Sequence, residues 1–175
     1  MQVFKVLFLL IFSACGAGID WRTRRLPNVL TVPGVVVGLL FHAIDGYLQS
    51  GWTGGYQSLL FSMLGFLTGF GLLLVVWLAG GGGAGDVKLV GAIGAWIGPW
   101  ATLAVVCLAC LVAAVFVCGM LLQKLVRTVM RNSETGNHPS VGAPAPNNLP
   151  FGVPAAIATW LYVLYAEVLR PWLLG

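Results

Sequence analysis

Two acidic residues lie at the ends of apolar runs, where acidic residues are uncommon. The chain has five Asp and Glu residues among 175. Asp20 ends the first apolar run, and Asp86 follows the glycines of "LAGGGGAGDVKL" at 78–89. A carboxylate at the centre of a bilayer costs about 2.5–3.5 kcal/mol on insertion scales, so acidic residues in such segments are usually functional. Asp20 and Asp86 are therefore the candidates for chemistry.

Two carboxylates held close together can perform acid–base catalysis without a metal ion. Like charges within a few ångströms cannot both ionise freely, so the pair shares one proton. One carboxylate then acts as a base and the other as an acid, which is what activating a water against a peptide carbonyl requires. A catalytic pair of aspartates that hydrolyses a peptide bond is therefore one hypothesis for these residues. Backbone without Cβ atoms at the glycines would also let an extended peptide approach.

Other roles compete with this hypothesis. Asp20 could cap a helix or pair with Arg22 or Arg24. Asp86 could cap the helix that follows it, with Lys88 reaching the lipid headgroups. The alternative function is non-enzymatic: a proton-coupled membrane transporter or a pilus-assembly scaffold, with the aspartates as a proton relay. A transporter would be expected to place acidic residues at several depths or to show repeats, and the sequence shows neither.

The composition predicts an integral membrane protein. The hydrophobic fraction is 59% and the charged fraction 8%, with a mean hydropathy of +0.94. The apolar runs are continuous and lack the alternation of a membrane barrel, so the fold class is all-α. The length fits a single transmembrane domain over 1–175. The net charge of +4 fits cytoplasmic loops better than nucleic-acid binding.

Six transmembrane helices are predicted, against the roughly 20 residues that a spanning helix needs. The fourth is short, and Gly98-Pro99 separates it from the fifth. Gly91, Gly94 and Gly98 have the spacing of a helix-packing face. The predicted segments are 2–19, 30–49, 56–79, 86–98, 101–122 and 151–169.

The basic residues predict the orientation of these helices. Three arginines directly follow Asp20 and outweigh Lys5, so the first helix is expected to be uncleaved, with its N-terminus outside. Both termini then lie outside, and both aspartates lie at the cytoplasmic boundary. The Pro-, Gly- and Asn-rich stretch 132–149 is predicted to be a flexible cytoplasmic loop. The basic residues predicted to lie inside are Arg22, Arg24, Arg25, Lys88, Lys124, Arg127 and Arg131.

The cysteines give no indication of a metal site. They are Cys15, Cys107, Cys110 and Cys118, all inside apolar runs. "CLAC" at 107–110 has CxxC spacing, but a second pair and a nearby histidine are missing. We expect lipid-facing or core thiols and no metal or cofactor.

Three stretches resemble the motifs of type IV prepilin peptidases, a family of GxGD membrane aspartyl proteases. "DWRTRRLPNVLT" at 20–31 resembles the first-aspartate motif, and "GAGDVKL" at 83–89 resembles the GxGD motif with its lysine. "LPFGVPAA" at 149–156 resembles the Pro-Phe-Gly motif before the last helix. Together the three occur in the order and spacing of the family.

The resemblance implies a six-helix bundle with its active site at the cytoplasmic face of the inner membrane. It also implies cleavage of the short, positively charged leader of prepilins or pseudopilins, just before their hydrophobic helix. Asp20 and Asp86 would be the catalytic dyad. Lys88 would tune or position Asp86. The remaining supporting residues would be Gly83, Gly85, Pro27, Asn28, Pro150, Phe151 and Gly152. Pro27 and Pro150 could instead simply start helices.

One departure from the larger, bifunctional members bears on the activity. Those carry a cytoplasmic domain with two CxxC pairs between the first helix and the first aspartate, and they also N-methylate the new pilin terminus. Here the first apolar segment continues directly into Asp20. We therefore expect a short form, similar to the peptidases of Flp (tight-adherence) pili, without methyltransferase activity. The sequence is also compatible with the archaeal preflagellin peptidases, which are another short relative.

Overall fold

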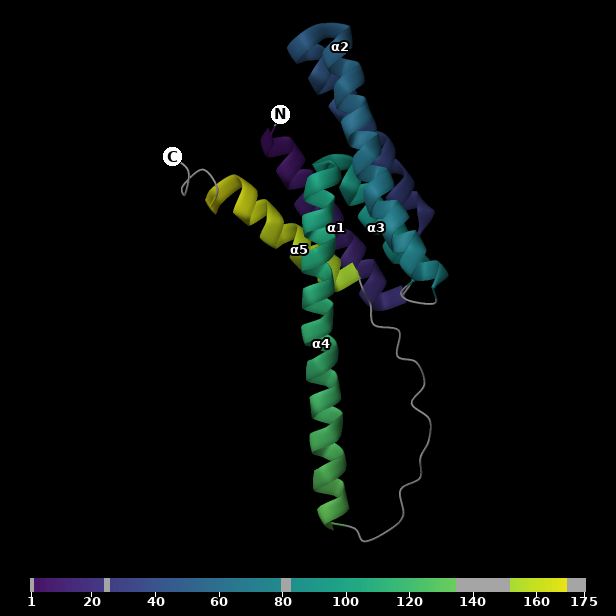
Figure 1. The fold of residues 1–175 in the computed structure, drawn as a ribbon, viewed down its shortest axis with the longest axis vertical. Coiled ribbons are helices and arrows are strands. Elements are labelled where there is room, and N and C mark those ends of the chain that lie inside the picture. Colours follow the sequence, from purple (N-terminus) through teal and green to yellow (C-terminus); the bar gives the residue numbers. More distant parts are fainter. Residues whose placement is uncertain (1, 24–25, 80–82, 135–151, 170–175) are drawn as a thin grey trace.

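The computed structural model describes residues 2–23, 26–79, 83–134 and 152–169. All elements in these ranges are helical (Figure 1): α1 (Gln2–Thr23), α2 (Asn28–Leu78), α3 (Ala84–Ile97), α4 (Pro99–Glu134), α5 (Gly152–Leu164) and the π-helical turn η1 (Tyr165–Leu169). The predicted all-α class is therefore correct for the described part of the chain. Three helical stretches are long and apolar enough to cross a membrane: Val3–Thr23, Asn28–Leu78 and Pro99–Thr128.

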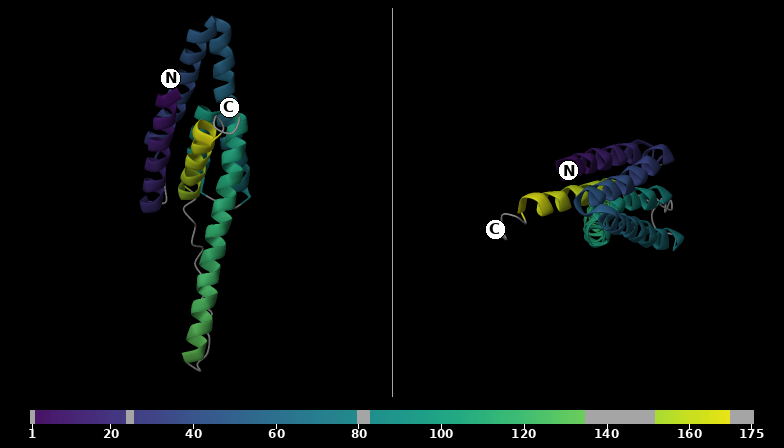
Figure 2. Two further views of the ribbon diagram at one scale, coloured as in Figure 1. Left: turned by 90° about the vertical axis from the view of Figure 1, so that its left-hand side faces the viewer. Right: turned by 90° about the horizontal axis from the view of Figure 1, so that it is seen from above.

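α2 joins two of the predicted segments into one element that reverses direction. Ser50 and Gly51 have non-helical dihedral angles, and Gly51 has φ +66°, a conformation that side chains with a Cβ rarely adopt. Beyond this point the second half runs back along the first. The two are in close contact near the kink, where a Cβ on Gly46 would meet the Gly54 carbonyl and the Ser58 side chain. Figure 2 shows this hairpin at the top of its left view. The gap between the predicted segments 30–49 and 56–79 is thus a sharp kink inside α2.

α3 packs between the two halves of α2 with very close backbone contact. A Cβ at Gly65 would overlap the Gly94 carbonyl oxygen, and one at Gly69 would lie 2.6 Å from the Val90 carbonyl oxygen. Small residues allow such approach between helices in lipid, where dispersion contacts provide much of the association energy. The packing role predicted for Gly94 is confirmed. Gly98, with φ +81°, ends α3 before Pro99 starts α4, as the sequence indicated.

The core of the bundle forms around Trp96 of α3. Its side chain is fully buried and stacks on Phe8 of α1 with ring centroids 4.1 Å apart. The indole N–H donates to the Gly34 carbonyl at 2.9 Å, and a Cβ on Gly38 would lie 2.8 Å from the same indole nitrogen. One aromatic side chain thereby joins α1, α3 and the first half of α2.

α5 packs against α1 and α4, and α4 extends well beyond the other helices (Figure 1). α4 has 36 residues, which at about 1.5 Å per residue exceeds the roughly 30 Å of a bilayer core. It reaches Glu134 and so includes the first three residues of the predicted loop 132–149. The remainder of that loop lies outside the described residues.

The outer surface of the described helices is largely apolar, as a lipid-facing surface should be. Large exposed side chains include Val29, Trp52, Val75 and Val115, each more than two-thirds exposed. A soluble monomer rarely exposes apolar surface on this scale. All four cysteines are free and exposed, in agreement with the lipid-facing alternative for these thiols.

Candidate active site

Asp20 lies in the last turn of α1 and is held by the start of α5. Its side chain is 5% exposed, and its Oδ2 accepts a hydrogen bond from the Gly152 backbone N–H at 2.9 Å. This N–H belongs to the first residue of α5, where helix N–H groups lack intrahelical partners. A Cβ on Gly152 would lie 2.7 Å from Oδ2, so glycine is needed for this approach. Because α1 continues to Thr23, Asp20 does not cap a helix N-terminus.

Asp86 lies in the first turn of α3 and is 7% exposed. Its Oδ2 accepts a hydrogen bond from the Gly83 N–H at 2.9 Å, while its own N–H donates to the Gly83 carbonyl at 3.0 Å. This reciprocal arrangement is the helix-capping role that the sequence offered as an alternative. Capping fixes the carboxylate at the positive end of α3, so it is compatible with a chemical role.

The two carboxylates lie at the same end of the bundle on adjacent, oppositely directed helices. α1 runs toward this end and α3 runs away from it (Figure 1). A Cβ on Gly16 of α1 would lie 2.7 Å from Leu89 Cδ1 of α3. Asp20 is four residues beyond Gly16, and Asp86 is three residues before Leu89. Both therefore lie about one turn further toward the same end, and the charge of Asp20 repels that of Asp86.

Leu26, which lies just before α2, packs against the start of α3. A Cβ on Gly85 would lie 3.2 Å from the Leu26 backbone nitrogen. Pro27 is the N-cap of α2, with φ −71° and ψ 142°, and its carbonyl accepts from the Leu30 N–H at 3.1 Å. The expectation that Pro27 starts a helix is thus correct to within one residue. Gly85 permits this contact because it has no side chain.

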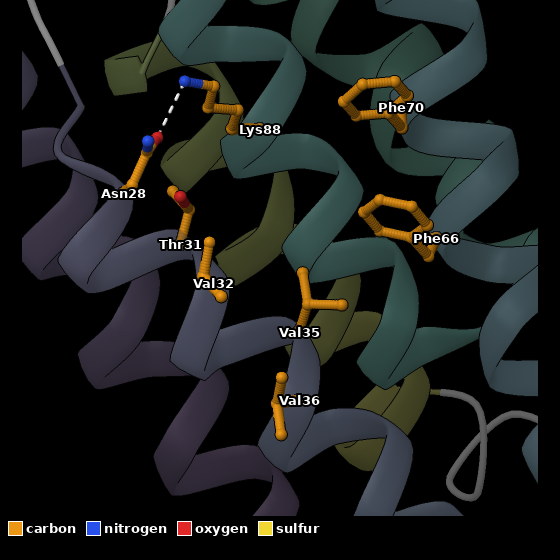
Figure 3. Close-up of a pocket in the computed structure, with 8 residues that line it drawn as sticks. All are labelled: Asn28, Thr31, Val32, Val35, Val36, Phe66, Phe70 and Lys88. Atoms are coloured by element: carbon orange, nitrogen blue, oxygen red, sulfur yellow. Dashed lines mark hydrogen bonds between the residues drawn. The ribbon is translucent and has the colours of Figure 1, made fainter.

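Lys88 contacts α2 and points away from Asp86. Its ammonium group donates to Asn28 Oδ1 at 2.8 Å (Figure 3). Two residues along an α-helix correspond to about 200° of rotation, so Lys88 and Asp86 project from opposite sides of α3. Any influence of Lys88 on Asp86 therefore passes through the placement of α3.

The third predicted motif is described only in part. Pro150 and Phe151 lie outside the described residues, whereas Gly152 directly contacts Asp20. Gly83 is the N-cap of α3, and Gly85 lies in its first turn beside Asp86. The structure thus brings five predicted residues into one region at the end of the bundle: Asp20, Gly83, Gly85, Asp86 and Gly152.

Thr31 was given no role from the sequence, although it ends the quoted motif 20–31. Its side chain is 2% exposed, and among the described residues its Oγ1 is the buried side-chain polar atom without a hydrogen-bond partner. Leaving a buried hydroxyl unpaired costs about 1–3 kcal/mol. The only available signal was its position as a polar residue near the start of an apolar segment.

The described residues form a helical bundle with the apolar surface of a membrane protein and two buried carboxylates at one end. Residues 7–118 match the type IV leader peptidase family. A "Prepilin leader peptidase/N-methyltransferase" of Aeromonas salmonicida is 33% identical over 160 residues, which cover 90% of this chain and 47% of that protein. The protein of the same name from Xanthomonas campestris is 30% identical over 173 residues, which cover 95% of this chain and 51% of that protein. The protein of the same name from Escherichia coli K12 is 38% identical over 97 residues, which cover 51% of this chain and 39% of that protein.

The chain belongs to the type IV leader peptidase family. It spans about half the length of the first two of these relatives. No solved structure matches the chain.

Proposed function

We propose that this chain is a membrane-embedded aspartic endopeptidase that removes the positively charged leader from type IV prepilins of the Flp type. Asp20 and Asp86 are its catalytic pair. The observation that carries the proposal is the placement of two buried carboxylates at one end of an apolar bundle, each hydrogen-bonded by a glycine N–H. Membership of the leader peptidase family supplies the substrate class.

In the proposed reaction the pair shares one proton. The ionised carboxylate removes a proton from a water molecule, whose oxygen attacks the scissile carbonyl carbon. The protonated carboxyl group donates its proton to the carbonyl oxygen, which gives a neutral tetrahedral intermediate. On collapse the C–N bond breaks, and the amine nitrogen takes the proton that the first carboxylate received from water. The other carboxylate takes back a hydroxyl proton from the intermediate, so the pair again holds one proton. The N–H groups of Gly83 and Gly152 donate to Asp86 and Asp20 and so fix the positions of both carboxyl groups for these transfers.

The proposed topology has six membrane segments, both termini outside and the dyad at the cytoplasmic face of the inner membrane. The kink at Ser50 and Gly51 supports this because it lets the two halves of α2 act as separate crossings. The exposed Lys124 and Arg127 on the long end of α4 support a cytoplasmic location for that end.

We also propose that the chain does not methylate its product. The observation that supports this is the continuity of α1 from Gln2 to Thr23, which places Asp20 in the same helix as Gln2 with no cysteine-rich segment between them. The names of the relatives include N-methyltransferase, and the proposal is therefore specific to this chain.

The test is cleavage of a full-length Flp-type prepilin from the same genome by the purified chain in proteoliposomes. Asp20→Asn and Asp86→Asn should each reduce the rate by about 100-fold or more, because each removes a proton-transfer group. Asp45→Asn is the matched control: Asp45 accepts a hydrogen bond from Gln49 at 2.8 Å, within the first half of α2 and away from the dyad. Wild-type rates in either dyad variant would refute the catalytic assignment. Methyl transfer from S-adenosylmethionine to the mature pilin is measured in the same samples and should be absent.

A further inference from the structure

A groove of about 360 Å³ lies beside α3, on the side opposite Asp86. Figure 3 shows its two walls, formed by the two halves of α2. The first half contributes Thr31, Val32, Val35 and Val36, and the second half contributes Phe66 and Phe70. Val32 and Val36 are about half exposed, so the groove opens at the lateral, lipid-facing surface of the bundle.

The groove exists because the face of α3 that carries Lys88 continues with small residues. Gly91 is three residues further along and Ala95 seven, so both share the face of Lys88. A Cβ on Gly91 would lie 3.1 Å from Phe70 Cβ. The glycine therefore lets Phe70, a wall residue of the groove, pack directly on the backbone of α3. Lys88 and Asn28 form a hydrogen bond at the end nearest the start of α3.

We propose that this groove binds apolar side chains from the first turns of the substrate's membrane helix, and that Thr31 binds the backbone at the start of that helix. The proposal rests on the proposed function, because it assigns the docking surface of the same enzyme. A volume of about 360 Å³ is too small for a whole helix and fits two or three side chains from one helix face.

The unpaired hydroxyl of Thr31 favours a helix start as the occupant. The first four N–H groups of any helix lack intrahelical acceptors, and in a membrane each unsatisfied group is costly. Thr31 lines the groove, and its Oγ1 is buried without a hydrogen-bond partner among the described residues. It therefore offers an acceptor where such a helix would need one, and the valines and phenylalanines beyond it would contact apolar side chains.

The position of the groove relative to the dyad fits a substrate cleaved just before its helix. Lys88 and Asp86 project from opposite sides of α3, and a helix is about 10 Å wide. A peptide leaving the groove would cross the start of α3 at Gly83, which is exposed and has no side chain to obstruct it. About three extended residues span that distance at roughly 3.3 Å each. The scissile bond should thus lie about three residues before the first side chain in the groove.

Photo-crosslinking tests the occupant directly. A benzophenone amino acid is placed at Val36, which lines the groove, or at the adjacent Val37, which does not. Their exposed fractions are similar, 47% and 39%, so Val37 is a matched control. Both are made in the Asp20→Asn variant, which should retain the uncleaved prepilin. We expect prepilin adducts at Val36 at least fivefold above those at Val37. Equal yields, or adducts to lipid alone at Val36, would overturn the proposal.

Kinetics of Thr31→Val provide a second, independent measurement. Losing one hydrogen bond should raise KM about 3- to 10-fold with little change in kcat. The melting temperature should stay the same or rise, because an unpaired buried hydroxyl is removed. A purely structural role would not raise KM while preserving stability. Thr31→Ser should restore KM, and Thr68→Val is the control, since Thr68 already bonds the Leu64 carbonyl within its own helix.

The two levels of the proposal fail in different ways. If the wild-type chain cleaves the prepilin but Val36 gives no adduct and Thr31→Val leaves KM unchanged, the groove assignment is wrong and the peptidase assignment stands. If the wild-type chain does not cleave the prepilin, the proposed function and the groove assignment both fall.

Discussion

The backbone N–H of Gly152 donates to Asp20 Oδ2 at 2.9 Å, although the two residues are 132 positions apart in the chain. This hydrogen bond connects the first residue of α5 to the last turn of α1. The carboxylate is therefore placed by two helices, so that small movements of α5 would be transmitted to it.

Gly152→Ala should disturb this contact and reduce activity. The added Cβ would lie 2.7 Å from Oδ2 and 2.9 Å from the Asp20 Cβ, so α5 or the carboxylate has to move. A misplacement of about 1 Å at a catalytic group can cost up to about 100-fold. We expect kcat/KM for prepilin cleavage to fall about 10- to 100-fold. Gly18→Ala is the control on the same helix as Asp20, because its Cβ would meet nothing within 4 Å. Equal activity of the two variants would contradict the prediction.

Substitutions of Asp86 should separate its capping role from its chemical role. Asp86→Asn retains an oxygen that can accept from the Gly83 N–H, so its stability should stay close to that of the wild type. Asp86→Ala leaves this donor unpaired, which should lower the free energy of unfolding by about 1 kcal/mol. Both variants should be inactive. The measurements are unfolding in mixed micelles and cleavage of prepilin. An active Asp86→Asn variant would leave capping as the sole role of the side chain.

The hydrogen bond between Lys88 and Asn28 should couple α3 to the start of α2. A double-mutant cycle with Lys88→Met and Asn28→Ala should give a coupling free energy of about 0.5–1.5 kcal/mol. Each single variant loses the 2.8 Å hydrogen bond. The free energy of unfolding of the double variant should therefore be no lower than that of the less stable single variant. Strictly additive effects would show that the bond contributes nothing to stability.

Gly94→Ala should destabilise the bundle far more than Gly71→Ala. A Cβ on Gly94 would overlap the Gly65 carbonyl oxygen, whereas one on Gly71 would meet nothing within 4 Å. Overpacking of this kind costs about 1–3 kcal/mol. We expect a clearly lower melting temperature in detergent for Gly94→Ala alone. Similar melting temperatures for both variants would mean that α2 and α3 separate easily at this contact.

Cysteine labelling should test the proposed topology. In a variant without the four native cysteines, Lys124→Cys should react with a membrane-impermeant maleimide only from the cytoplasmic side. Asp45→Cys should react only from the opposite side, because Asp45 lies near the kink of α2 at the other end of the bundle. Inverted and right-side-out vesicles provide the two exposures. Labelling of both positions from one side would refute the proposed orientation.

Hydropathy and local residue chemistry were sufficient to predict much of this fold. The apolar segments, the break at Gly98-Pro99 and the close packing at Gly94 all follow from short stretches of sequence, because hydrophobic length and backbone freedom are local properties. The sequence also showed that Asp20 and Asp86 lie at the ends of apolar segments. The reversal inside α2 was predicted only as a turn, since helix continuity up to Ser50 depends on packing between the two halves.

The partners of the site residues depended on the tertiary structure. Lys88 bonds Asn28, Gly152 bonds Asp20, and Thr31 lacks a partner in the described structure. Each of these facts concerns groups on different helices. The sequence determined which side chains could do chemistry and at which end of the membrane segments they would lie. The contact of Asp86 with the Gly83 N–H is local and follows from the start of a helix. Only the packing of the helices decided that Asp20 meets the Gly152 N–H, because in lipid the close contacts between helices, and not burial from water, select the arrangement.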